Sequence, residues 1–175
     1  MAGQPNHLVS VDWLAEHLDD SAVCVLDVTA RLDRELVNRS HDACFVEGHI
    51  PGAVHFDVAS AKGVLSDPVA DLPWMWPGAG RVTEALRAAG VDDGDLVVIT
   101  ASTPRPGIDS GTMWCTRAWW TLTRMGVRAV VLHGGNEAWV AAGQPVETGP
   151  VEVAPGSITV GERASGRAEV DEVLD

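Results

Sequence analysis

Residues 96–120 have the sequence LVVITASTPRPGIDSGTMWCTRAWW, and this stretch decides the fold of the chain. Leu96–Thr100 is a continuous apolar, β-branched run, which is typical of a strand buried on both faces. A loop rich in Pro, Gly, Ser and Thr follows, and the segment TRAWWTLTRMG then predicts a helix that ends at Gly126. The order of strand, loop and helix indicates an α/β fold.

Similar runs on either side of this stretch extend the pattern. Further strands are predicted at Val23–Val28, Ala53–Asp57 and Ala129–His133. Helices are predicted in SVDWLAEHL, with Ser10 as the N-cap, in GRVTEALRAAG, with Gly90 as the C-cap glycine, and in EAWVAAG. Buried strands that alternate with helices imply a parallel central sheet of about five strands with helices on both faces.

The length of 175 residues is enough for one well-buried domain, and two full domains are not expected. We place this domain at residues 8–147. The composition changes after residue 147. Residues 148–175 are acidic, contain Pro and Gly, and have few large apolar side chains. We therefore expect a C-terminal extension or linker over this last segment.

The charge balance excludes several classes of partner. Twelve basic and twenty-five acidic residues give a net charge of −13, which argues against binding nucleic acid or an anionic membrane surface. No run is long and apolar enough for a membrane span, and the N-terminus lacks the basic and apolar regions of a signal peptide. We expect a cytoplasmic protein, whose small substrate can still be an anion if a few arginines converge locally.

Three cysteines, Cys24, Cys44 and Cys115, form an odd set without the paired spacing of zinc ligands. Neither a disulfide framework nor a structural zinc site is expected. Four potential metal ligands lie close in sequence, namely His41, Cys44, Glu47 and His49. Their spacing matches no standard zinc pattern, and no dinucleotide or phosphate motif surrounds Gly134. We expect no metal and no cofactor.

Six separated phrases together resemble the rhodanese domain, the thiosulfate sulfurtransferase fold. They are LVSVDWLAEHL, VCVLDV, EGHIPGAVHFD, LRAAGVDDGDLVVIT, RAWWTLTRMGVRAVVLHGGNEAW and AAGQPV. The resemblance runs from about Leu8 to Val146 and is nearest to the N-terminal half of tandem-domain sulfurtransferases. It implies a thiolate that takes sulfane sulfur from thiosulfate or 3-mercaptopyruvate, holds it as a persulfide and passes it to a thiol or a sulfur-carrier protein.

The resemblance places the nucleophile immediately after the strand, at a position that is Ala101 in this chain. Alanine has no nucleophile, and the neighbouring Ser102 has no evident base. The family's short loop ends in an arginine, whereas here fourteen residues separate the strand from Cys115. Because the N-terminal half of the tandem proteins is generally non-catalytic, the resemblance implies an inactive site.

Cys115 nevertheless has a physical argument of its own. It lies at the expected start of the helix, where unpaired N–H groups and the helix dipole favour a thiolate, and Arg117 is close in sequence. We name Cys115 as the candidate catalytic residue. The candidate substrate-binding residues are Arg117, Arg105, Ser102, Ser110, Thr112 and Ala101. The alternative interpretation is that Cys115 is a small buried core residue.

Two functions therefore stay open at this point. One is a divergent sulfurtransferase that forms a Cys115 persulfide, and the other is a non-catalytic rhodanese-like binding or regulatory module. Trp119 and Trp120 point about 100° apart on a helix, so one of them is expected to line a pocket or meet a partner. That partner would be a second copy or a second rhodanese domain. A phosphatase-type site is disfavoured, because its cysteine and loop-ending arginine are both missing.

Overall fold

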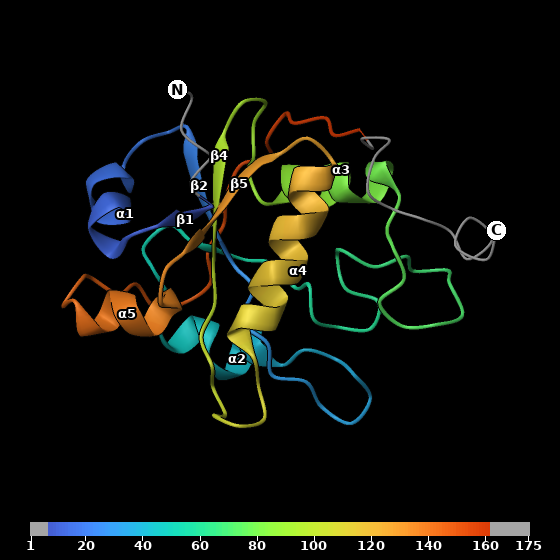
Figure 1. Cartoon of the computed structure of the whole chain (residues 1–175), viewed down its shortest axis with the longest axis horizontal. Coiled ribbons are helices and arrows are strands. Elements are labelled where there is room, and N and C mark those ends of the chain that lie inside the picture. The colour runs from blue at the N-terminus through green and yellow to red at the C-terminus, as the bar shows by residue number, and fades with distance from the viewer. Residues whose placement is uncertain (1–6, 162–175) are drawn as a thin grey trace.

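The computed structural model describes residues 7–161, which form a five-stranded, all-parallel sheet covered by helices (Figure 1). The strands lie in the spatial order β1-β5-β4-β2-β3. Their bounds are β1 (Leu8–Val9), β2 (Val23–Asp27), β3 (Val54–His55), β4 (Leu96–Thr100) and β5 (Arg128–Leu132). The predicted α/β class with a central parallel sheet is confirmed.

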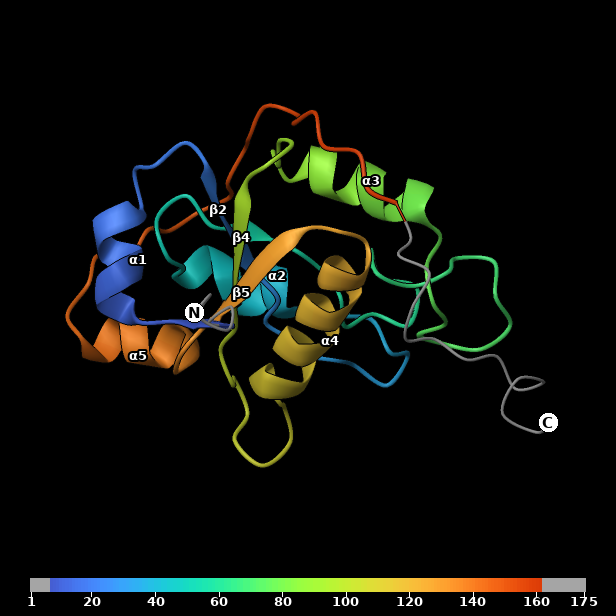
Figure 2. The same cartoon turned by 45° about the horizontal axis from the view of Figure 1, so that its top comes forward.

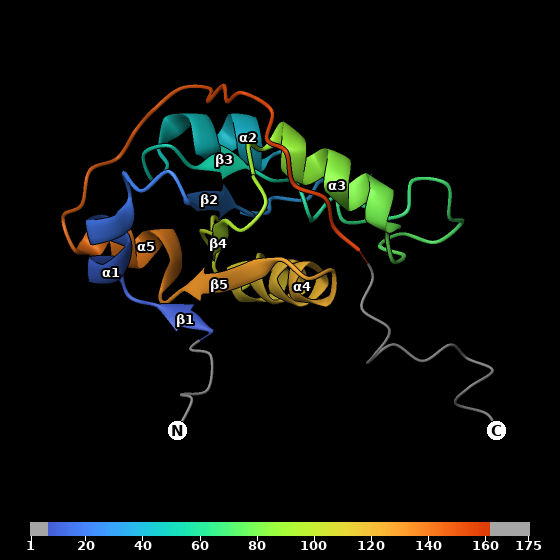
Figure 3. The ribbon, with the colours of Figure 1, turned by 90° about the horizontal axis from the view of Figure 1, so that it is seen from above.

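Helices lie on both faces of the sheet, as Figure 3 shows from above. They are α1 (Val11–His17), α2 (Ser40–Ala43), the 3-10 turn η1 (Phe45–Glu47), α3 (Ala79–Ala88), α4 (Gly111–Arg124) and α5 (Gly135–Ala141). One core contains side chains of α3 and α4, and the other contains Leu14 of α1, Phe45 of η1 and Trp139 of α5. Among the described helices, none is both long and apolar enough to cross a membrane.

Local chemistry explains most of these elements. Ser10 caps α1, because its Oγ accepts a hydrogen bond from the Trp13 N–H at 3.1 Å. Gly90 follows α3 with a φ of 79°, a left-handed conformation that suits glycine. The sequence pattern does not predict β1, which has only two residues, or the short α2 and η1 between β2 and β3.

The start of α4 corrects the sequence-based expectation. The helix begins at Gly111, five residues before the predicted start at Thr116. Ser110 is its N-cap, and the Ser110 Oγ accepts a hydrogen bond from the Met113 N–H at 3.2 Å. The loop after β4 is therefore shorter than expected, and Cys115 is the fifth residue of the helix instead of lying just before it.

Residues 148–161, the described part of the predicted extension, run back along α3 (Figure 2). Ile158 and Val160 are 5% and 9% exposed and belong to the core beneath α3 and α4. Arg87 of α3 fixes the segment, donating to the Ile158 carbonyl at 2.7 Å and to the Thr159 Oγ1 at 2.8 Å. This segment therefore adds apolar side chains to the core.

Candidate functional site

The topology singles out one edge of the sheet. From β2 the chain crosses to β3 on one side, and from β4 it crosses to β5 on the other side. The strand order therefore reverses between β2 and β4, and the loops that follow these two strands diverge there. In open α/β sheets, ligands bind in the crevice outside the carboxyl ends of the strands at such a point.

A buried polar network holds this edge together. The Asp27 carboxylate, in a residue that is 1% exposed, accepts hydrogen bonds from the Thr29 N–H and the Asn136 Nδ2, both at 2.8 Å. Asn136 also donates to the Ser102 Oγ at 3.0 Å and accepts from the Thr100 Oγ1 at 2.6 Å. The network ties the ends of β2 and β4 to the start of α5, so it positions the loop that carries Ser102.

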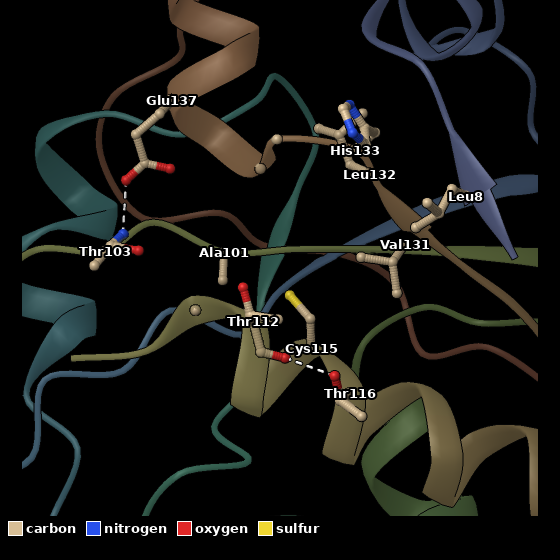
Figure 4. Close-up of a pocket in the computed structure, with 13 residues that line it drawn as sticks. Leu8, Ala101, Thr103, Thr112, Cys115, Thr116, Val131, Leu132, His133 and Glu137 are labelled. Carbon is tan, nitrogen blue, oxygen red and sulfur yellow. Dashed lines mark hydrogen bonds between the residues drawn. The ribbon is translucent and has the colours of Figure 1, made fainter.

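Cys115 lines a pocket of about 370 Å³ beside this network. Figure 4 shows its Sγ atom directed into the space between Ala101 and Val131, with Thr112 nearby and Glu137 across the pocket. Cys115 is nevertheless only 6% exposed. The thiol therefore faces the pocket from a largely buried position.

The electrostatics of this pocket favour the protonated thiol. Burial raises the pKa of Cys115 to about 12, and the charges of Asp27 and Glu137 act in the same direction. The helix dipole is strongest within the first turn, and Cys115 lies just beyond it. Because the thiolate is the nucleophilic form, Cys115 is a weak nucleophile at neutral pH in this conformation.

The loop N–H groups near the pocket already have acceptors within the chain. The Thr103 N–H donates to the Glu137 Oε1 at 2.6 Å, and the Ser102 N–H donates to the Thr29 Oγ1 at 2.8 Å. A sulfur-bearing anion in this pocket would have to replace these acceptors and would also meet the Glu137 carboxylate. The pocket around Cys115 is therefore poorly suited to a dianion such as thiosulfate.

The other predicted site residues do not form one site in the structure. Ala101 and Thr112 lie with Cys115, whereas Ser102 and Arg105 line a separate pocket. Ser110 is the cap of α4. Arg105 donates to the Asp109 carboxylate at 2.7 and 2.9 Å, and neither Arg105 nor Arg117 lines the pocket of Cys115.

Arg117 is used in packing. Its guanidinium donates to the carbonyls of Leu65 at 2.8 Å and Trp74 at 3.0 Å, and burial lowers its pKa. Among residues 7–161, no three His, Cys, Asp or Glu side chains come together as a metal site would require.

Sequence reasoning missed Asn136 and Glu137, the two α5 residues that face the loop after β4. The signal was the turn Gly134-Gly135, which follows a strand and therefore lies at the carboxyl edge of the sheet. Gly135 has a φ of 62°, and a Cβ there would lie 2.3 Å from the Ala101 carbonyl oxygen. Glycine thus lets α5 approach β4 closely enough for Asn136 to reach the network.

The sequence of the chain is similar to a family model and to several known proteins. A model of the rhodanese-like domain matches residues 10–142. The chain is 32% identical over 169 residues to the 3-mercaptopyruvate sulfurtransferase of Escherichia coli (strain K12), covering 95% of this chain and 55% of that protein. It is also 32% identical over 152 residues to the thiosulfate sulfurtransferase of Gallus gallus, covering 84% and 48%.

Structural similarity agrees with the sequence. The crystal structure of SseA from Escherichia coli, described as having the rhodanese fold, superposes with a TM-score of 0.79 at 30% identity, covering 97% of this chain and 60% of that one. A 3-mercaptopyruvate sulfurtransferase from Leishmania major has the same fold, with a TM-score of 0.76 at 22% identity, covering 99% and 46%. The chain spans about half the length of the curated relatives it matches.

Proposed function

Because the chain belongs to the rhodanese-like domain family, we propose that it takes part in sulfur transfer from a small anionic donor to a thiol or sulfur-carrier acceptor. Relatives named as sulfurtransferases, and one in Thermus thermophilus named as the sulfur carrier protein TtuD, support this role. In this proposal the persulfide-forming cysteine comes from a second rhodanese domain. The protein acts in the cytoplasm.

One observation favours a second domain as the source of the persulfide-forming cysteine. The position that the rhodanese resemblance assigns to the nucleophile is Ala101, and the cysteine that faces the same edge, Cys115, is held as a neutral thiol by burial. Sulfur transfer from thiosulfate requires a thiolate to attack the outer sulfur, so that sulfite leaves with the electron pair of the broken S–S bond. A domain without an available thiolate needs another domain for this step.

An apolar groove supports association with that second domain. A groove of about 440 Å³ beside the start of α4 is lined by four apolar residues and one cation, namely Leu32, Trp74, Met113, Trp114 and Arg117. Met113 is 52% exposed, and Ile108, in the loop before α4, is 75% exposed. The relatives are about twice as long as this chain, which favours a second domain as the occupant. A homo-oligomer is the competing outcome.

Trp119 and Trp120 do not contribute to this groove, although one of them was expected to line a pocket or meet a partner. The Trp120 side chain packs edge-on against Trp76, with ring centroids 4.7 Å apart, and the residue is 36% exposed. Trp119 is half-buried, and its Nε1 donates to the Ala129 carbonyl at 3.1 Å. Neither tryptophan lines the groove of Met113 and Trp114.

The competing function, a Cys115 persulfide, is favoured by one feature, the direction of the Sγ into the pocket. Intact-mass spectrometry after incubation with thiosulfate or 3-mercaptopyruvate separates the two proposals. We expect no stable gain of one sulfur atom on the wild-type chain through Cys115. A sulfur adduct that disappears in Cys115→Ser would overturn our choice and establish Cys115 as the carrier.

Sedimentation velocity tests whether the groove binds a second copy of this chain or is free for a different domain. If the chain is monomeric at micromolar concentration, the groove is free for a different domain, as proposed. If it dimerises, and Met113→Glu abolishes the dimer while Val69→Glu does not, the groove joins two copies and the second-domain proposal fails. Val69 is a matched control because it is 86% exposed and lies outside the groove.

A further inference from the structure

The pocket of Cys115 has no part in the sulfur transfer proposed above, yet it has the size of a ligand site. It lies among the end of β5, the loop after β4, the start of α4 and the turn before α5. Leu8 and Val131 lie on one side of the Cys115 Sγ, and Ala101 lies on the other (Figure 4). The volume of about 370 Å³ is at the lower end of the range for ligand pockets, so the pocket suits a small organic molecule.

The charges around this pocket are mainly negative. Glu137 lines it with a carboxylate, and no arginine or lysine of residues 7–161 lines it. The charges of Glu137 and of the buried Asp27 both act on Cys115, where they help to raise the pKa of the thiol. His133 also lines the pocket, but its side chain is exposed to water, which weakens its effect on a ligand. A pocket with this balance attracts cations and repels anions.

The Glu137 carboxylate is held in place with one oxygen available. Its Oε1 accepts a hydrogen bond from the Thr103 N–H at 2.6 Å, which fixes the side chain across the pocket from Cys115 (Figure 4). Within residues 7–161, no donor is bonded to the Oε2. Hydrogen bonds between a carboxylate and a charged donor are the strong ones, so the Oε2 is a ready acceptor for an ammonium group.

The Cys115 thiol is a second, independent sign of a ligand. The residue is only 6% exposed, and its Sγ is directed into the cavity, where it makes no hydrogen bond with any described residue. Because burial keeps the thiol protonated, the sulfur adds no charge and presents a weak acceptor to the N–H groups of a ligand. The Thr112 hydroxyl nearby is a further acceptor.

The first turn of α4 is the main feature that opposes a cation. Gly111 and Thr112 line the pocket, and the N-terminal end of a helix carries a partial positive charge of about half a unit. Ser110 already caps this end, because its Oγ accepts a hydrogen bond from the Met113 N–H. The full negative charge of Glu137 exceeds the partial charge of the helix, so the net preference is for a cation.

We propose that this pocket binds a small organic monocation, a primary ammonium group on a short apolar chain. The ammonium group donates to the Glu137 Oε2, and the apolar chain packs against Leu8 and Val131. This ligand is opposite in charge to the anionic sulfur donor of the proposed function, so it is a different molecule. The proposal does not depend on sulfur transfer, because binding is measured without it.

The test uses three probes of nearly the same shape and different charge, namely n-butylammonium, n-butanol and butyrate. Each is titrated into the ¹⁵N-labelled chain at constant pH and ionic strength, and amide chemical shifts report the binding. We expect n-butylammonium to shift the signals of the pocket residues saturably, with a Kd about fivefold below that of n-butanol, the effect of one partly exposed ion pair. Butyrate is expected to bind most weakly. Butyrate binding as tightly as n-butylammonium, or no saturable shifts at the pocket, would overturn the proposal.

Two matched variants test the role of Glu137. Glu137→Gln removes the charge but keeps a carbonyl that can accept from the Thr103 N–H, so the local structure is preserved. It is expected to raise the Kd of n-butylammonium about fivefold and to change that of n-butanol less than about twofold. Glu84→Gln, at an exposed position of α3 outside the pocket, is expected to change both less than about twofold. Equal effects of the two variants on n-butylammonium would contradict the assigned ion pair.

Protection of Cys115 tests where the ligand lies. In a Cys24→Ser, Cys44→Ser background at constant pH, n-butylammonium is expected to slow alkylation of Cys115 by iodoacetamide in proportion to its occupancy, whereas butyrate at the same concentration is not. An unchanged rate at saturating n-butylammonium would place the ligand away from the Sγ and overturn the proposal. A missing sulfur adduct has no bearing on it, because that result concerns the transfer step alone.

Discussion

Replacing Asn136 with leucine is expected to lower the free energy of unfolding by about 3 kcal/mol or more, because two buried groups, one of them a carboxylate, each lose a hydrogen-bond partner. The substitution removes the amide that donates to the Asp27 Oδ2 and the oxygen that accepts from the Thr100 hydroxyl. Both Asp27 and Thr100 are buried, so water does not replace the lost partners without opening the sheet edge. Urea denaturation followed by tryptophan fluorescence measures the change.

Two further variants test whether the loss of stability in Asn136→Leu comes from the buried polar network. His133→Leu alters an exposed side chain near the same turn and is expected to change the free energy of unfolding by less than about 0.5 kcal/mol. Asp27→Asn in the Asn136→Leu background removes the uncompensated carboxylate, and it should recover at least about 1 kcal/mol. A loss in Asn136→Leu no larger than that in His133→Leu would show that the network does not hold the edge.

The alkylation rate of Cys115 is expected to rise about tenfold for each pH unit between about pH 7 and 10, roughly a thousandfold in all, without reaching a plateau. The sign follows from the pKa of about 12, because burial keeps the thiol protonated until the pH approaches that value. Intact-mass spectrometry with iodoacetamide in a Cys24→Ser, Cys44→Ser background gives the rate at each pH.

The pH dependence of Cys115 alkylation should also be measured in Glu137→Gln and compared with that of the wild-type chain. The Glu137 carboxylate is one of the causes that raise the pKa of Cys115, so its removal is expected to increase the rate at each pH. The increase should be small, because burial is the largest cause and stays unchanged. A plateau at or below about pH 8 in the wild-type chain would mean that Cys115 is an activated thiol, and the proposal of a separate persulfide-bearing domain would lose its basis.

The main strands and helices were predictable because each rests on a local pattern. Val23–Asp27 and Leu96–Thr100 are continuous apolar runs, and α3 has its apolar residues on one face. The start of α4 was not predictable in the same way, because Gly111 and Thr112 are poor helix formers and the Ser110 cap lies inside a loop-like composition. Tertiary packing, rather than local propensity, sets that boundary.

The candidate site was harder to predict because proximity in sequence does not imply proximity in space. Cys115 and Arg117 are two residues apart in a helix, so their side chains point about 160° apart. The helix therefore directs Cys115 toward the sheet and Arg117 toward Leu65 and Trp74. Asn136 and Asp27 are 109 residues apart, and only the strand order brings them together.

The path of residues 148–161 sets the length of tether that a following domain would need. This segment ends beside the carboxyl end of α4, where the Gly161 N–H donates to the Met125 carbonyl at 3.4 Å. The apolar groove lies at the other end of α4, beside Met113, and the 14 residues of that helix span about 21 Å. At about 3.3 Å per extended residue, roughly seven residues beyond Gly161 bridge this distance. A domain joined by a shorter tether would be confined to the amino end of the sheet, out of reach of the groove.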